Sequence, residues 1–455
     1  MTDMEQLTET DQRIRLVEYF EKGGKPPSNW SIGTEHEKFL YRASDLKRLD
    51  YFSSPGIGTI LEHMRDYGWE ALTEGDRLIG LKKDGASISL EPGGQFELSG
   101  RNFRTVHETF AETERHFDEL KVICRKFGVF SLSLGFDPLW ELNEVPWMPK
   151  TRYALMREYM PLRGSHGLDM MTRTATIQVN LDYENERDMI NKMRVAQGLQ
   201  AVVTALFANS PFSGGKPNGF LSYRAHVWND TDPDRCGFLP FIFEEGFGFE
   251  RYTEYLLDVP MYFIIRDGKY LPAGNITFRD FLAGKAGIKP LMQDWETHVS
   301  TVFPDVRLKR FIEMRGADGS CVHHIAALAA LWVGLLYDSE SLSEALALIA
   351  SWSLEEMQEL RDKVPVQGLK ASAGRIHAGD TAREMVRIAS EGLERRANLL
   401  GIASEATYLE PLREIAASGI TMAENHLRCY YEQWNEDVRK LVSSWPKMRC
   451  SCEDC

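Results

Sequence analysis

The sequence lacks the features of a membrane or exported protein. It has no run of about 18 uninterrupted apolar residues, the length that a spanning helix needs. Its first residues, Met1-Thr-Asp-Met-Glu-Gln, have neither the basic and apolar regions of a signal peptide nor the Arg-rich character of a transit peptide. We therefore expect a cytoplasmic protein that has no membrane partner.

Positive charge is also in short supply. Lysine and arginine number 53 against 67 acidic residues, which gives a formal net charge of −14. Proteins that bind the phosphate backbone of nucleic acids need a basic patch, and no run of Lys or Arg occurs here. The composition predicts no nucleic-acid partner, and an anionic nucleotide would have to be bound through a metal ion.

Cysteine is scarce, with seven residues in 455. Four of them, Cys124, Cys236, Cys321 and Cys429, are widely scattered. Small disulfide-stapled domains carry closely and regularly spaced cysteines instead. We expect no disulfide framework among these four.

The other three cysteines, Cys450, Cys452 and Cys455, lie within the last six residues. Their spacing suits binding of a soft metal or thiol exchange, but a structural zinc site needs a fourth ligand. A frayed, non-catalytic terminus is the alternative, since chain ends are often poorly ordered.

A phosphate-binding loop is missing as well. The Gly/Pro-rich segment Ser210-Pro-Phe-Ser-Gly-Gly-Lys-Pro-Asn-Gly219 is not one. A phosphate loop requires Ser or Thr after the lysine, and proline follows here.

What the sequence does contain is a set of acidic side chains in short strand-like segments: Glu35 and Glu37 in residues 32–38, Glu91 and Glu97 in residues 88–98, and Glu313 in residues 310–315. Side chains alternate across a strand, so Glu35 and Glu37 face the same way, as do Glu313 and Arg315. Apolar residues flank each segment, which indicates that these acids border a core. Solvated strand faces are the alternative.

Clustered carboxylates repel one another and take up protons unless a cation holds them. Hard oxygen ligands with few His or Cys favour magnesium over zinc. The pattern therefore predicts a magnesium site of the kind that holds phosphates.

Apolar spacing predicts helices over residues 6–22, 105–127, 186–207, 325–337, 342–350, 381–399 and 421–442. Residues 174–182 form the clearest strand, with Ala175, Ile177, Val179 and Leu181 on one face and Thr176, Gln178, Asn180 and Asp182 on the other. This pattern indicates a half-buried sheet with a polar working face.

No convincing linker or internal repeat divides the chain. We expect one catalytic domain over residues 1–455, with an N-terminal helix in 1–28, a mainly helical part in 320–445 and a Cys-rich tail in 446–455. A single domain that gathers all the acidic segments is simpler than two.

Several longer motifs resemble the plant-type glutamate–cysteine ligases, a family that also occurs in bacteria. They are Ile32-Gly-Thr-Glu-His-Glu-Lys-Phe39, Ile88-Ser-Leu-Glu-Pro-Gly-Gly-Gln-Phe-Glu-Leu-Ser-Gly100, Ala208-Asn-Ser-Pro-Phe212, Lys216-Pro-Asn-Gly-Phe-Leu-Ser222 and Glu313-Met-Arg-Gly-Ala-Asp318. The likeness runs from about Ile32 to Leu399.

The resemblance implies an α+β fold of the glutamine synthetase superfamily, in which helices surround a funnel-shaped antiparallel sheet. It also implies an ATP-dependent carboxylate–amine ligase. In this reaction the γ-carboxylate of glutamate is phosphorylated by ATP, and the amine of cysteine then displaces the phosphate to give γ-glutamylcysteine. The implied cofactors are ATP and Mg²⁺, with Mn²⁺ as a substitute, and the reaction is the first step of glutathione synthesis.

The family's metal-binding positions match Glu35, Glu37, Glu91, Glu97 and Glu313. Gln178 lies where related ligases often place a metal-binding histidine, although a sheet-face amide that bonds its neighbours fits equally well. Glu313 and Arg315 are the implied catalytic pair, with Arg315 contacting the transferred phosphate.

Arg224 resembles the family's clamp for the glutamate α-carboxylate. Asn180 is expected in the substrate lining, and Lys309 at the ATP phosphates or, alternatively, at the surface. His36 points away from Glu35 and Glu37 by alternation, so we expect a structural role for it.

One departure from the plant enzymes concerns redox control. Plant members carry two regulatory disulfides, and the matching positions here are Phe110 with Ala326 and Ala273 with Ile288. Neither bridge can form, so we expect a monomer or a weak homodimer. Two alternatives stay open: a ligase of this fold that joins glutamate to another amine, and a non-catalytic binding protein.

Overall fold

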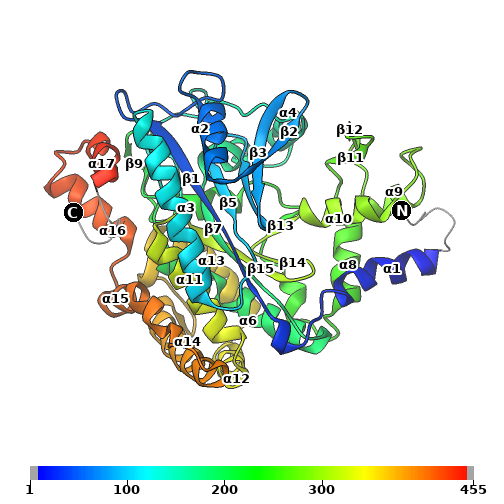
Figure 1. Ribbon diagram of the computed structural model, residues 1–455. Helices are drawn as coiled ribbons and strands as arrows, with labels where there is room; N and C mark the ends of the chain where they lie inside the picture. Colours follow the sequence, from blue (N-terminus) through cyan, green and yellow to red (C-terminus); the bar gives the residue numbers. More distant parts are fainter. Residues whose placement is uncertain (1–8, 448–455) are drawn as a thin grey trace.

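One antiparallel sheet of nine strands organises the structure, a computed structural model that describes residues 9–447 (Figure 1). The strand order is β14-β15-β7-β1-β5-β4-β3-β2, and β6 also pairs with β1. Its strands are β1 (Ile32–Arg42), β2 (Glu70–Glu74), β3 (Arg77–Lys83), β4 (Ala86–Leu90), β5 (Phe96–Ser99), β6 (Val129–Leu132), β7 (Thr176–Leu181), β14 (Val306–Leu308) and β15 (Ile312–Asp318).

Four two-stranded sheets accompany it: β8 (Phe212–Ser213) with β9 (Lys216–Pro217), β10 (Cys236–Gly237) with β13 (Phe303–Pro304), β11 (Phe263–Arg266) with β12 (Lys269–Pro272), and β16 (Ser372–Ala373) with β17 (Ile376–His377). The α-helices are α1 (Glu9–Glu21), α2 (Ile57–Met64), α3 (Val106–Lys126), α4 (Thr151–Tyr159), α5 (Gly167–Arg173), α6 (Glu186–Leu206), α7 (Tyr223–Asn229), α8 (Phe249–Asp258), α9 (Phe278–Leu282), α10 (Met292–Ser300), α11 (Val322–Leu336), α12 (Ser339–Ile349), α13 (Leu354–Gln367), α14 (Ala378–Leu400), α15 (Glu410–Ser418), α16 (Met422–Glu432) and α17 (Val438–Ser444).

The predicted α+β class with a large antiparallel sheet is confirmed. So are the helix over residues 105–127, the helix over 186–207 and the strand over 174–182, which correspond to α3, α6 and β7. The single helix predicted over residues 421–442 is wrong. It is broken between α16 and α17, where Asn435 and Glu436 have positive φ values that a helix does not allow.

Strand β1 ties the sheet together because three neighbours share its length. Ile32 to His36 pair with β7, Glu35 to Lys38 pair with β5, and Phe39 to Arg42 pair with β6. Its alternation places Glu35 and Glu37 on one face. His36 and Lys38 are buried on the other face, where His36 stacks on Phe117 of α3, as expected for a structural role.

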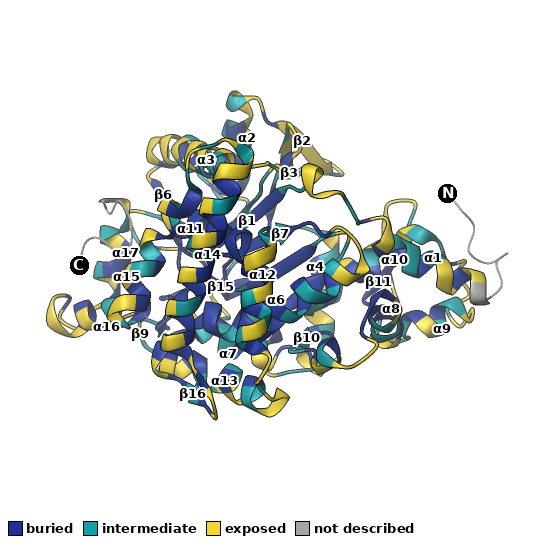
Figure 2. Ribbon diagram, turned by 90° about the horizontal axis from the view of Figure 1, so that it is seen from below, coloured by how far each residue is buried: buried dark blue, intermediate teal, exposed yellow. Residues whose placement is uncertain are grey.

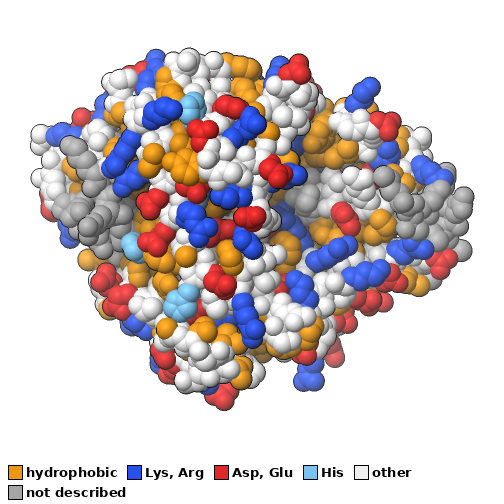
Figure 3. Space-filling view, viewed as in Figure 1, with side chains coloured by type: hydrophobic (Ala, Val, Ile, Leu, Met, Phe, Trp, Pro, Cys, Tyr) orange, Lys and Arg blue, Asp and Glu red, His pale blue; other side chains and the backbone are white. Residues whose placement is uncertain are grey.

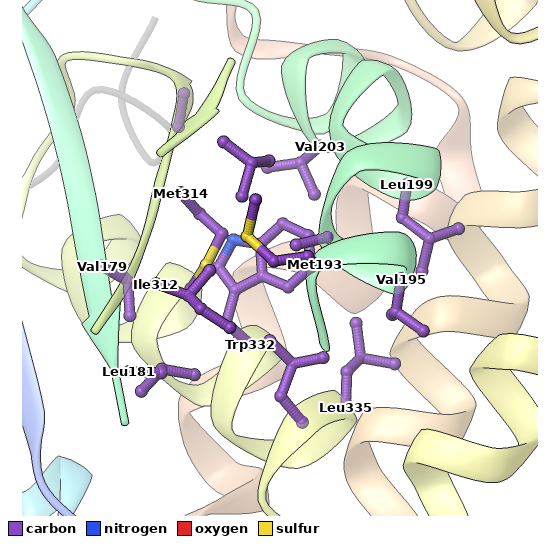
Figure 4. Packing of buried hydrophobic residues seen from close by; sticks show 14 of the residues in the cluster. Val179, Leu181, Met193, Val195, Leu199, Val203, Ile312, Met314, Trp332 and Leu335 are labelled. Atoms are coloured by element: carbon purple, nitrogen blue, oxygen red, sulfur yellow. The ribbon is translucent and has the colours of Figure 1, made fainter. Parts of the chain in front are cut away.

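The apolar face of the sheet packs against helices that cover it (Figure 4). Val179 of β7 and Met314 of β15 lie in the same core cluster as Met193 of α6 and Trp332 of α11, and each is at most 1% exposed. Full burial of such side chains contributes roughly 1.5–3 kcal/mol each. This layer fixes one face of the sheet, so the polar face of β7 and β15 is the one left for a binding site.

The two ends of the molecule are built from different parts of the chain. In Figures 1 and 2, α1, α8, α9, α10 and the β11–β12 hairpin lie together at one end, and α16 and α17 at the other. Phe20 of α1 makes an edge contact with Tyr252 of α8, and Arg13 pairs with Glu254. Acidic and basic side chains are interspersed on the face shown in Figure 3.

Two cysteines depart from the expectation drawn from their spacing. Cys321 and Cys429 each take part in a disulfide bond, which their scattered spacing did not lead us to expect. Sequence spacing does not report which distant residues the fold brings together. Cys124 and Cys236 are free thiols, and burial raises the pKa of each to about 12. Cys450, Cys452 and Cys455 lie outside the described residues.

Within residues 9–447 no single helix is long and apolar enough to cross a membrane, although α11 and α12, joined at an 89° bend, pass that test as a pair.

The turn between β4 and β5 brings two of the acidic residues into position. Gly94 has a φ of +80°, and its N–H donates to the carbonyl of Glu91 at 2.8 Å. Gly93 packs against α5, where an added Cβ would lie 2.2 Å from the carbonyl oxygen of Thr172 and 2.7 Å from its Cα. Backbone atoms cannot move aside as side chains can, so this position requires glycine.

We therefore expect Gly93→Ala to lower the free energy of unfolding by about 1–3 kcal/mol, the usual range for overpacking. Gly198→Ala in α6 is the matched control, because the three nearest atoms to its new Cβ belong to the Ile349 side chain, at 3.2 Å or more. Urea denaturation of both variants measures the difference. Equal effects would contradict the backbone clash.

Candidate active site

A cleft of 400 Å³ opens on the polar face of the sheet. This volume is within the usual range for small-molecule sites. The cleft is lined by four glutamates, Glu35, Glu37, Glu91 and Glu97, and by four arginines, Arg152, Arg224, Arg307 and Arg315. Aromatic and apolar residues complete it, among them Tyr153, Met156, Trp228, Phe263, Tyr270 and Phe303.

The strand register brings the four glutamates together, as the sequence predicts. Glu37 of β1 lies directly opposite Glu97 of β5, and the turn before β5 supplies Glu91. Asn180 of β7 donates to Glu35 at 3.0 Å, and the Thr176 N–H donates to Glu37 at 2.9 Å. Like charges placed directly opposite destabilise a sheet unless something else compensates them.

The protonation of this cluster reflects the crowding. Burial, with the charges of Glu97 and Glu91, raises the pKa of Glu37 well above 4.5. Burial, with the charges of Glu91 and Glu35, raises the pKa of Glu97 to about 8. A bound cation would remove this penalty, so the donor set fits a hard metal ion.

The carboxylates do not yet converge on one point. Among the residues that the structure describes, no three His, Cys, Asp or Glu side chains form a ready ligand group. Glu35, Glu37, Glu91 and Glu97 are the residues that could hold a cation once their side chains close on it.

Glu313 has surroundings different from those the sequence predicts. It is fully buried and is not among the residues that line the cleft. Arg307 donates to its Oε1 at 2.6 Å, Arg315 donates to the same oxygen, and the Lys309 Nζ lies 3.0 Å from its Oε2. Burial opposes its ionisation, but these three cations outweigh burial and lower the pKa of Glu313. Glu313 thus orients two cleft arginines, and the structure does not bring it to the other four acids.

Two further predicted residues are already engaged. Gln178 lines the cleft, and its Oε1 accepts from Arg315 Nη1 at 2.7 Å. Because that oxygen is the amide's only metal-binding atom, Arg315 competes with any ion for it. Asn180 contacts Glu35 and is not among the lining residues, so it lies one layer behind the position that the sequence predicts.

The predicted arginines both reach the cleft. Arg315 and Arg224 line it, and Arg224 Nη2 donates to the backbone carbonyl of Arg315 at 2.8 Å. Lys309 is held against Glu313 and is not a lining residue.

Sequence reasoning misses Arg307, which lines the cleft and pairs with Glu313. The register of β14 against β15 places these two residues directly opposite each other. A short strand with a charged residue between Val306 and Leu308 is a signal that could have found it. Arg152 and Tyr153 of α4 are missed as well, because no strand pattern marks them.

A solved structure places this fold in a known class. The glutamate–cysteine ligase from Francisella tularensis, solved in complex with AMP, superposes with a TM-score of 0.54 over 92% of this chain and 88% of that one. With 11% identical residues, that likeness concerns the fold alone. The chain therefore has the architecture of this ligase class.

Sequence relatives define the family. A chloroplastic glutamate–cysteine ligase from Brassica juncea is 48% identical over 95% of this chain and 83% of its own length. Glutamate–cysteine ligase B of Oryza sativa subsp. japonica is 47% identical over 95% of this chain and 87% of its own length. The model of glutamate–cysteine ligase family 2 matches residues 31–444. The chain belongs to glutamate–cysteine ligase family 2.

The same relatives correct one expectation. The plant enzymes that match, those from Brassica juncea, Medicago truncatula and Arabidopsis thaliana among them, are named as chloroplastic. The cytoplasmic location inferred from the first residues of the sequence is overturned by this finding. That inference depended on the composition of a few N-terminal residues.

The raised pKa values predict how stability depends on pH. Both acids bind protons more tightly in the folded protein than in the unfolded chain, so stability falls as pH rises from 4.5 to about 8. We expect Glu37→Gln to flatten this fall, because glutamine cannot ionise. Denaturation at a series of pH values without divalent cations measures it. Glu70→Gln on the exposed strand β2 is the control, and equal slopes in the wild type and Glu37→Gln would contradict the assignment.

Proposed function

We propose that this chain ligates the γ-carboxylate of glutamate to the amine of cysteine and consumes ATP, the activity for which its family is named. The observation that carries the proposal is the cleft itself, in which four carboxylates face Arg224, Arg307 and Arg315. Acids that can hold a cation, next to guanidinium groups that bind oxyanions, suit a reaction between a nucleotide and an amino acid.

The reaction has two steps. A γ-carboxylate oxygen of glutamate attacks the terminal phosphorus of ATP, and ADP leaves. The cysteine amine, having lost a proton, then attacks the acyl carbon, and phosphate leaves with the electrons of the broken C–O bond. The products are γ-glutamylcysteine, ADP and phosphate, which constitutes the first step of glutathione synthesis.

The arginines suit the charges that develop in both steps. Arg307 and Arg315 share the Glu313 oxygen, which fixes their guanidinium groups in a buried setting. Preorganised donors of this kind stabilise a transferred phosphoryl group without reorganising during the reaction. We assign these two to the phosphate, with Lys309 acting through Glu313, and Arg224 to the α-carboxylate of glutamate.

Magnesium is the cation we propose for Glu35, Glu37, Glu91 and Glu97, and Mn²⁺ would accept the same oxygen donors. When bound, such an ion neutralises charge between these carboxylates and the ATP phosphates. Gln178 is the weaker candidate, because Arg315 already holds its oxygen. Asn180 would orient Glu35 from behind and would not touch substrate.

The test of the proposal is phosphate release from ATP in the presence of magnesium and glutamate, with one amine added at a time. We expect release to rise sharply with cysteine. A sharp rise with a different amine would keep the ligase and change its acceptor. No release with any amine would contradict the proposed reaction and favour a binding protein.

For the metal site, we expect Glu35→Gln to lower turnover on the order of a hundredfold, the usual cost of removing one electrostatic group from an active site. Thermal unfolding adds a readout independent of turnover, since Mg²⁺ should raise the melting temperature of the wild type more than that of the variant. Glu70→Gln, on an exposed strand of the same sheet, is the matched control. An Mg²⁺ response of the same size in Glu35→Gln would remove Glu35 from the site.

A further inference from the structure

Asp318, the last residue of β15, is a buried carboxylate that the reaction itself does not use. It is fully buried and is absent from the cleft lining. Its Oδ2 accepts from the Ser210 hydroxyl at 2.6 Å and from the Asn209 N–H at 2.9 Å, and its Oδ1 accepts from the Ser222 hydroxyl at 2.8 Å. A Cβ added at Gly135 would lie 2.4 Å from its Cγ, so the carboxylate occupies a closely fitted space.

Both serine hydroxyls also accept a hydrogen bond from the backbone of helix α7. The Arg224 N–H donates to the Ser210 hydroxyl at 3.1 Å, and the Ala225 N–H donates to the Ser222 hydroxyl at 3.2 Å. A hydroxyl has a single proton, and here each one is donated to Asp318. The oxygens are thereby turned so that their lone pairs accept from the first turn of the helix.

Helix α7 depends on such outside contacts, since seven residues are too few to hold a helix by themselves. It presents Arg224 and Trp228 to the cleft, four residues apart on one side. Arg224 Nη2 then donates back to the carbonyl of Arg315 on β15. The contacts form a closed loop from Asp318 through two serines and α7 to the strand where Asp318 itself lies.

We propose that Asp318 is a positioning residue that sets the place of Arg224, and so the affinity for the amino-acid substrate that Arg224 binds. The inference rests on the proposed function, in which Arg224 holds the glutamate α-carboxylate. Asp318 touches neither substrate nor nucleotide; it acts through Ser210, Ser222 and the backbone of α7.

Asp318→Asn tests this role, because the amide keeps the shape and puts a donor where one acceptor was. The three groups that donate to Asp318 then compete for the remaining oxygen. We expect the KM for glutamate to rise about tenfold or more, as loss of a charge-assisted hydrogen bond predicts. The KM for ATP should stay within about twofold, since we assign the ATP phosphate to Arg307 and Arg315 and not to a residue of α7.

Glu405→Gln is the matched control. Glu405 is also fully buried, accepting from the Val106 N–H at 2.6 Å and from Arg396 at 2.5 Å, and it joins α3 to α14 instead of cleft elements. Its loss should lower the melting temperature and leave the KM for glutamate unchanged. If Asp318→Asn does not fold, Ser222→Ala removes one of the two relays and should raise the KM for glutamate in the same direction by a smaller factor.

The outcomes separate the two proposals. A wild type that shows no glutamate-dependent phosphate release would overturn the proposed function and this inference with it. An active wild type and a folded Asp318→Asn with unchanged KM for glutamate would overturn the inference alone. Equal rises in the KM for glutamate and for ATP would also overturn it, because they would indicate a general structural role.

Discussion

The antiparallel register of β1 with β5 and β7 is the constraint on which the cleft depends. It sets Glu37 opposite Glu97 and places Glu35 beside β7, so acids from distant parts of the sequence meet on one face. The helices packed on the other face hold that register through apolar contacts. Apolar packing in the core therefore offsets the repulsion between the crowded carboxylates, and it stabilises the sheet whether or not a cation is bound.

A second group of charged residues lies next to the four cleft glutamates, and positive charge predominates in it. Glu313 forms ion pairs with Arg307, Lys309 and Arg315, whereas the four cleft glutamates form none with the residues that the structure describes. Buried ion pairs are weak contributors to stability, but breaking one is costly. Their value here is geometric, because one carboxylate oxygen aligns two guanidinium groups. The site thus combines a place that attracts cations with a fixed set of anion-binding groups.

The sequence predicts those parts of the site that follow from local periodicity. Alternation identifies Glu35, Glu37 and Gln178, and the family motifs identify Arg224. What it misses depends on pairing between distant segments: Arg307 reaches Glu313 only through the register of β14 with β15, and the same neighbours separate Glu313 from the cleft acids. The apolar spacing of a helix likewise continues through residues 433–437, where the backbone leaves the helical conformation. The disulfide bonding of Cys321 and Cys429 is a property of the folded chain that spacing does not encode.

The alternation along β1 has a consequence for how the gene can vary. Glu35 and Glu37 face the cleft, whereas His36 and Lys38 are buried behind the strand. Insertion or loss of one residue in this stretch would exchange the two sets, because a strand repeats every two residues. The cleft would then present a histidine and a lysine, and two carboxylates would enter the apolar layer. Point substitutions can alter single side chains of this strand. The number of residues between Ile32 and Phe39 is fixed, because the face of the strand that lines the cleft must carry carboxylates.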